Sequence, residues 1–292
     1  MKISNILNER SGIIKAPKSA IDNVMSIVCT DFFSRAVTYI NELSDDYADL
    51  FSIYKKMIAD YRKKYGNFRL HSNFGSDSIT KGHTVIHMGD VDPRYFNKNK
   101  DAKHRTYKLD VIVDMIGDQN EVAASYRKKS AGQAARVSVW LPEENHLNVI
   151  FKAPELVTLL LERVEGYIEH ELMHAIQDMA LKQHDDTADS YDDGVMNWEK
   201  YYMSGIEFSP QILTAAKEFM LGVKESKALG VELTPEAIKK HLLRFINPQA
   251  PKVAGVDFPD SEFFHVLFSK DKAKWKKAIK SFYGLIQNEL KL

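Results

Sequence analysis

The chain has 292 residues, of which 44% are hydrophobic and 27% charged, and its 40 basic residues balance its 40 acidic ones. These values exclude disordered and fibrous compositions and leave no overall field that would draw the chain to nucleic acid or to an anionic membrane. The single cysteine excludes an intramolecular disulfide and a metal cluster built from cysteines, so any metal ion must be bound by histidines and carboxylates.

The N-terminal residues 1–10 lack the apolar segment of a secretory signal. No stretch approaches the roughly 18 apolar residues that cross a membrane. We therefore expect a cytoplasmic protein that is not secreted through such a signal and has no membrane partner. A reducing compartment also fits the single cysteine.

The first third of the chain has helical periodicity, and the next part has the β-branched, partly alternating pattern of strands. Apolar residues recur at helical spacing over residues 19–43 and 47–65, which predicts two helices. Strands are predicted next, at 83–88, 108–116 and 135–141, with a fourth expected at 148–151.

Helical periodicity returns at Pro154, a favourable first residue of a helix, and continues to about residue 181. Further helices are predicted at 210–229, 235–246 and 261–290. The order of helices, small sheet, long helix and more helices predicts an α+β fold.

The long helix carries the sequence His170-Glu171-Leu172-Met173-His174. Positions four apart lie on one face of a helix, so both imidazoles can bind one metal ion at about 2 Å from each nitrogen. Glu171 lies beside that face, where a carboxylate can take a proton from a metal-activated water that attacks a carbonyl carbon. The spacing therefore predicts a hydrolytic metal site, against the alternative that the two histidines are only packed or solvated.

A tetrahedral catalytic site needs a third protein ligand, because water takes the fourth position. We expect Glu207, which precedes a predicted helix that Ser209 can cap and Pro210 can begin. Glu207 can instead complement the positive end of that helix, or form a capping box with Ser204. The other candidates for the third ligand are Glu199, His184, Asp185, Asp186 and Asp189.

The segment His-Glu-Leu-Met-His-Ala-Ile-Gln-Asp at 170–178, preceded by predicted strands and followed by Tyr201-Tyr202 and Glu207, resembles the zincin metallopeptidases. More narrowly, it is similar to the gluzincin type, in which a downstream glutamate completes the HExxH site. It also resembles uncharacterised metallopeptidase-like proteins encoded by bacteriophages. The chain has no Gly-x-x-His after the motif, which argues against a metzincin.

This resemblance implies one Zn²⁺ ion bound by His170, His174 and Glu207, with Glu171 as the general base of a peptidase. It implies a zincin-like core at 67–208, in which a small, mostly antiparallel sheet packs on the long helix. An N-terminal leader with helices at 1–66 and a helical part at 209–292 would flank that core. The substrate would be a protein or peptide, which by analogy adds as a strand along 137–141.

A zincin often uses a tyrosine or histidine to stabilise the oxyanion that develops during the reaction. Among Tyr191, Tyr201 and Tyr202 we expect Tyr202 in this role, although core packing is the more common use of an aromatic side chain. Asp178, one turn after His174, can orient that ligand through a hydrogen bond, or can be solvated.

Other functions remain open on the residues alone. One is a phage virion or host-interaction protein that keeps the zincin scaffold without proteolysis, and another is a metal-dependent hydrolase of a non-peptide amide. Residues 6–9, Ile-Leu-Asn-Glu, resemble sites at which tailed phages trim proteins packed in their heads, so packaging in a virion is an alternative to the host cytoplasm. Nucleic acid is a less favoured partner, through Lys270, Lys272, Lys274, Lys276, Lys277 and Lys280.

Overall fold

The computed structural model describes residues 15–43, 48–72, 74, 78–91, 104–115, 122–130, 132–181, 191–192, 195–205, 207–228, 230–252 and 260–290. The chain divides into two compact units, the sheet unit Lys15–Lys182 and the C-terminal unit Gln183–Leu292. The parts expected at 1–66, 67–208 and 209–292 follow other boundaries, and they stay a prediction.

The sheet unit confirms the α+β class. Its mixed four-stranded sheet has the order β1-β2-β4-β3, in which β2 and β4 are parallel and the two outer pairings are antiparallel. The sheet is thus mostly antiparallel, as expected, and its one parallel pairing arises because β4 inserts beside β2. The strands are β1 (Thr80–His87), β2 (Thr106–Met115), β3 (Ala123–Arg127) and β4 (Arg136–Leu141).

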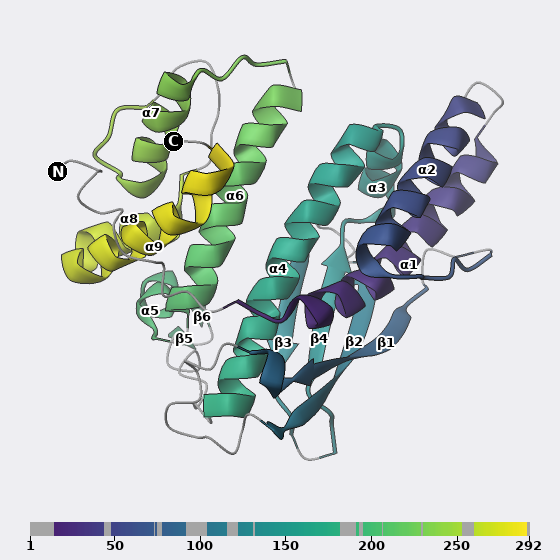
Figure 1. The fold of residues 1–292 in the computed structure, drawn as a ribbon, viewed down its shortest axis with the longest axis horizontal. Coiled ribbons are helices and arrows are strands. Elements are labelled where there is room, and N and C mark those ends of the chain that lie inside the picture. Colours follow the sequence, from purple (N-terminus) through teal and green to yellow (C-terminus); the bar gives the residue numbers. More distant parts are fainter. Residues whose placement is uncertain are drawn as a thin grey trace. The chain divides into compact units, whose positions relative to one another are not determined.

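Helices cover one face of this sheet. Helix α1 (Lys18–Glu42) packs on β1 and β2, and α4 (Pro154–Leu181) packs on β3 and β4, so both helices lie on the same side in Figure 1. Alternate strand residues turn to the helices, and Val111, Val137 and Val139 are completely buried there. Helix α2 (Ala48–Tyr65) packs on α1, and a short 3-10 helix, Met88–Asp90, follows β1.

The fourth strand predicted at 148–151 is wrong, because these residues belong to helix α3 (Glu144–Phe151). Leu147, Ile150 and Phe151 are buried, and their spacing of three and four is that of a helix face. Phe151 makes edge contacts with the ring of Phe32, and its carbonyl accepts a hydrogen bond from Tyr54 Oη at 3.0 Å. The aromatic core therefore selects the helix.

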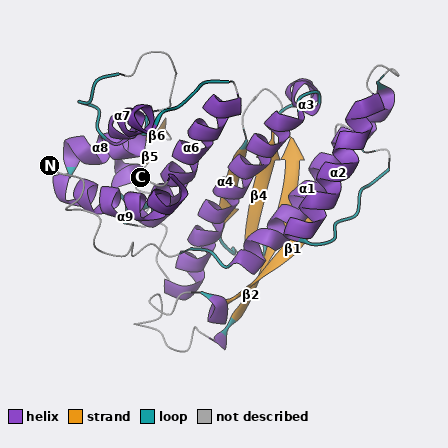
Figure 2. Cartoon of the chain, turned by 45° about the horizontal axis from the view of Figure 1, so that its top comes forward, coloured by secondary structure: helices purple, strands orange, loops and turns teal. Residues whose placement is uncertain are grey.

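The C-terminal unit is mainly helical, as Figure 2 shows. Its elements are a two-stranded ribbon of β5 (Tyr191–Asp192) and β6 (Val195–Met196), then α5 (Trp198–Met203), α6 (Phe208–Ala228), α7 (Pro235–Ile246), α8 (Glu262–Lys270) and α9 (Lys272–Leu290). Rings of Phe219, Phe245, Phe264 and Phe282 contact one another at its centre.

The single helix predicted at 261–290 is two helices, because the backbone of Asp271 is extended. Its carboxylate oxygen Oδ1 accepts hydrogen bonds from the backbone N–H groups of Ala273 and Lys274, at 3.0 and 2.9 Å. Asp271 therefore caps the N-terminus of α9. This acidic residue lies within a basic run, which is why helical periodicity alone did not reveal the break.

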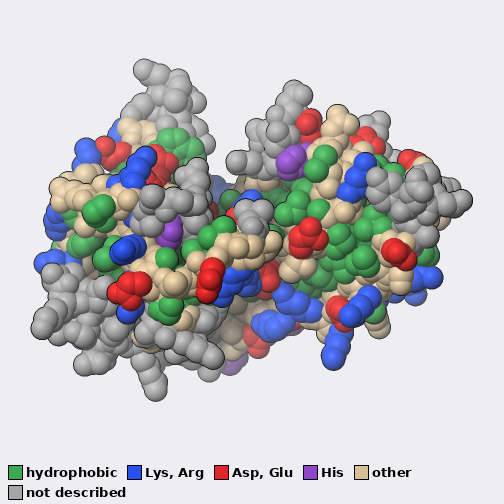
Figure 3. Space-filling model, turned by 90° about the horizontal axis from the view of Figure 1, so that it is seen from above, with side chains coloured by type: hydrophobic (Ala, Val, Ile, Leu, Met, Phe, Trp, Pro, Cys, Tyr) green, Lys and Arg blue, Asp and Glu red, His purple; other side chains and the backbone are tan. Residues whose placement is uncertain are grey.

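One face of the molecule carries interspersed charge. Figure 3 shows blue and red side chains scattered over the face seen from above, without separation by sign. Among the described residues, every helix is too short or too polar to span a membrane.

Candidate metal centre

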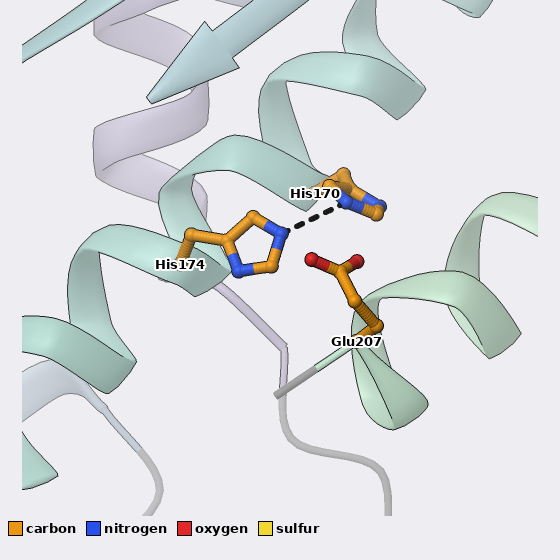
Figure 4. A group of neighbouring side chains, drawn as sticks. All are labelled: His170, His174 and Glu207. Atoms are coloured by element: carbon orange, nitrogen blue, oxygen red, sulfur yellow. Dashed lines mark hydrogen bonds between the residues drawn. The ribbon is translucent and has the colours of Figure 1, made fainter. Parts of the chain in front are cut away.

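Helix α4 brings His170 and His174 together, as the spacing of the motif predicts. Leu172, Met173 and Ile176 are completely buried and anchor this part of the helix in the core. The two Nε2 atoms lie 3.0 Å apart, and Figure 4 shows both rings on one side of the helix. Two ligands about 2.05 Å from a tetrahedral ion would be about 3.3 Å apart, so the pair is within a few tenths of an ångström of the geometry that a metal ion requires.

His174 is held in one tautomer by Gln177, one turn further along α4. The His174 Nδ1 atom lies 3.1 Å from Gln177 Oε1, and Gln177 is buried, with 6% of its surface exposed. An amide oxygen only accepts hydrogen bonds, so Nδ1 of His174 carries the proton and its Nε2 presents a lone pair. Without a metal ion, His170 Nε2–H can donate to that lone pair, and His170 would release this proton when an ion binds. A side chain that fixes the tautomer of a metal-binding histidine in this way is usual in metal sites.

Glu171 is also fixed, by the strand beside the helix. Its carboxylate oxygen Oε2 accepts a hydrogen bond from the backbone N–H of Tyr126 in β3, at 2.6 Å. The hydroxyl of Tyr126 donates to Asp178 Oδ2 at 2.7 Å. Asp178, which we considered as the partner of His174, therefore bonds to the strand, and Gln177 takes the place beside the histidine.

The strand expected to form the open edge of the sheet is an interior strand. Residues 137–141 belong to β4, which pairs with β2 on one side and with β3 on the other. A peptide cannot add to a strand that has partners on both sides. Among the described strands, the edge next to α4 is β3, which could not be predicted because Ala123–Arg127 lacks an alternating apolar pattern.

Glu207 lies in the C-terminal unit, immediately before α6, and has 1% of its surface exposed. Gln211 Nε2 donates to Glu207 Oε2 at 3.4 Å, and the Gln211 backbone N–H donates to the Glu207 carbonyl at 2.9 Å. His170, His174 and Glu207 offer two imidazoles and a carboxylate, and this group could hold a metal ion. The donor set of two imidazoles and a carboxylate suits a divalent ion such as zinc.

Tyr202, expected to stabilise the oxyanion, bonds elsewhere in the described structure. Its ring stacks on Trp198, and its hydroxyl donates to Glu262 Oε2 at 3.4 Å. Burial, followed by the nearby charge of Glu262, raises the pKa of Tyr202, so the phenol keeps its proton. Its neighbour Tyr201 accepts a hydrogen bond from Gln211 Nε2 at 3.3 Å. Tyr201 thus shares Gln211 with Glu207, and Tyr202 does not.

Of the other candidates for the third ligand, the structure describes Glu199 alone. Glu199 is half exposed and pairs with Lys270 at 2.8 Å, so it acts as one half of a surface ion pair. His184, Asp185, Asp186 and Asp189 lie outside the described residues.

Several lysines near the C-terminus take part in packing within the C-terminal unit. Lys274 Nζ donates to the Met203 carbonyl at 2.9 Å, and the ammonium group of Lys272 lies over the ring of Phe268. These contacts use part of the basic run that we considered for nucleic acid, and that partner stays a prediction.

Comparison of the chain with protein-family models, with curated proteins and with solved structures finds no match. The resemblance to zincins therefore depends on the HExxH segment and on the geometry described above.

Proposed function

We propose that the protein is a zinc-dependent peptidase. His170, His174 and Glu207 bind one zinc ion, and Glu171 is the general base. The observation that carries this proposal is the convergence of two imidazole Nε2 atoms at 3.0 Å, one of them fixed by Gln177 in the tautomer that binds metal. Gln177 leaves the Nε2 lone pair of His174 available to a metal ion, and His170 would release its Nε2 proton when the ion binds.

The chemistry follows from the residues beside the two histidines. A bound zinc ion would lower the pKa of its water molecule and polarise the carbonyl group of the substrate. Glu171 takes the proton from the attacking water and returns it to the leaving nitrogen. One oxygen of its carboxylate is fixed by the Tyr126 N–H, and the second oxygen of a carboxylate is able to accept the proton.

A peptide bond is the proposed substrate because β3 is an edge strand that reaches the general base. An extended peptide can pair with such an edge and present its carbonyl carbon beside α4. In β3 the N–H of Tyr126 points away from β4 toward Glu171, so substrate and base would share the same side of the strand. The proposal also includes a zincin-like core and a tyrosine, Tyr202 or Tyr201, that stabilises the oxyanion.

Elemental analysis tests the metal site. We expect one zinc per wild-type chain after reconstitution, and loss or strong weakening of binding in His170→Ala and Glu207→Ala. Glu199→Ala is the matched control, since this half-exposed glutamate pairs with Lys270, and it should bind zinc like the wild type. A wild-type chain that takes up no zinc would overturn the proposal and favour a virion or host-interaction protein without proteolysis. Zinc binding without cleavage of any peptide library would favour a hydrolase of a non-peptide amide.

A further inference from the structure

The face of the sheet opposite α1 and α4 carries two arginines in direct register. Arg127 of β3 pairs with Arg136 of β4. Val137 and Val139 turn to the helices and are completely buried, so Arg136, which alternates with them, turns to the other face. Arg127 shares that face, because residues directly opposite in a strand pair lie on the same side of the sheet. Figure 1 shows the helices of this unit on the other side.

Two like charges directly opposite each other destabilise a strand pair. The neighbour of Arg136 in the parallel strand β2 is Asp110, and this carboxylate would be the natural counter-charge. Among the described residues, however, no hydrogen bond or ion pair joins Asp110 to Arg136, nor any acidic side chain to Arg127. In the described part of the chain, two arginines therefore lie opposite each other in the strand pair and neither is bonded to a carboxylate.

Arg136 also has an unsatisfied donor. Its Nε atom is buried and has no hydrogen-bond partner. Buried donors of a folded protein nearly always have a partner, and an exception calls for a ligand, a water molecule or an ion. The like-charge pair and the unsatisfied Nε–H are separate observations, and one bound anion would account for both.

We propose that Arg127 and Arg136 form a binding site for a phosphate oxyanion. A guanidinium group donates through Nε–H and a terminal N–H in a fork that matches two oxygens of a phosphate. Two forks in register, followed along the chain by the exposed Lys128 and Lys129, would hold one phosphate from two sides. The phosphate is either a free one or a phosphodiester of a nucleic-acid backbone. This site is independent of the proposed zinc centre, because it lies on the opposite face of the sheet.

Nuclear magnetic resonance of the arginine Nε–H groups tests the proposal, in a buffer without phosphate or sulfate. Inorganic phosphate should shift the Arg136 Nε–H signal saturably, and calorimetry should give the dissociation constant. Arg127→Gln and Arg136→Gln should each raise that constant by about tenfold or more, as expected for loss of charge-assisted hydrogen bonds. Arg136→Lys should also weaken binding, because an ammonium group keeps the charge and loses the fork.

Arg69→Gln is the control, since Arg69 is an exposed arginine of the same unit, and it should bind phosphate like the wild type. A single-stranded oligonucleotide, titrated in parallel, separates the two sources of phosphate. Arginine-dependent binding of either probe supports the site, and tighter binding of the oligonucleotide with a steep salt dependence assigns it to a nucleic-acid backbone. The proposal is overturned if neither probe binds, or if binding is unchanged in Arg127→Gln and Arg136→Gln while thermal unfolding shows both variants to be folded.

Discussion

The backbone N–H of Tyr126 donates a hydrogen bond to the carboxylate of Glu171 at 2.6 Å. This bond joins the edge strand β3 to the HExxH helix at the residue that we propose as the general base. The phenol of Tyr126 adds a second bond, to Asp178 Oδ2, about two turns further along α4. Tyr126 therefore aligns the strand and the helix through its backbone and its side chain together.

Glu171→Gln should keep zinc and lose peptidase activity by at least about 100-fold, because an amide neither accepts nor returns the proton. Zinc content and cleavage rate, measured on the same preparation, separate the two effects. Glu155→Gln, an exposed change in the first turn of the same helix, should leave both unchanged. Full activity in purified Glu171→Gln would refute the role of this glutamate.

Tyr126→Phe should lower the free energy of unfolding by about 1 kcal/mol, since it removes the hydrogen bond to Asp178 and leaves the backbone bond to Glu171 in place. Urea denaturation measures the change. Tyr39→Phe, which removes a hydroxyl that makes no hydrogen bond among the described residues, is the matched control. Equal stability of both variants would show that the Tyr126 hydroxyl does not tie the strand to the helix.

The motif residues on α4 could be predicted because helical spacing alone places His170 and His174 on one face, and the bounds of that helix agree with Pro154–Leu181. The strand that fixes Glu171 could not be predicted. Residues of β3 are half-buried along most of their length, so no alternation marks them, and their role depends on pairing with a strand that comes later in the chain. The hydrogen bond of Gln177 to His174 could not be predicted either, because a glutamine on a helix does not indicate which neighbour its side chain contacts.

Loss of the ion pair between Asp31 and Arg35 on α1 should lower the free energy of unfolding and leave the metal site unchanged. Asp31 is completely buried and its Oδ2 lies 2.7 Å from Arg35 Nε, while Thr80 donates to its other oxygen. Asp31→Ala would leave a buried guanidinium without this partner, which costs about 3 kcal/mol of unfolding free energy. Urea denaturation should show this loss, and zinc per folded chain should equal that of the wild type. Unchanged stability would mean that Arg35 is compensated by its other contacts, such as the Ser78 carbonyl.

Substitution of Gln177 tests whether the tautomer of His174 sets the zinc affinity. Gln177→Met keeps most of the volume and removes the acceptor for His174 Nδ1–H, so zinc affinity should fall by about 10- to 100-fold. Gln177→Glu keeps an acceptor oxygen at that position and should restore most of the affinity. Nitrogen chemical shifts of His174 in the metal-free protein report the tautomer directly, and the Nδ1–H form should dominate in the wild type and in Gln177→Glu but not in Gln177→Met. Because this readout needs no metal, a wild-type His174 protonated on Nε2 would overturn the role of Gln177 even if zinc binds, whereas the expected tautomer without zinc binding would overturn the metal site alone.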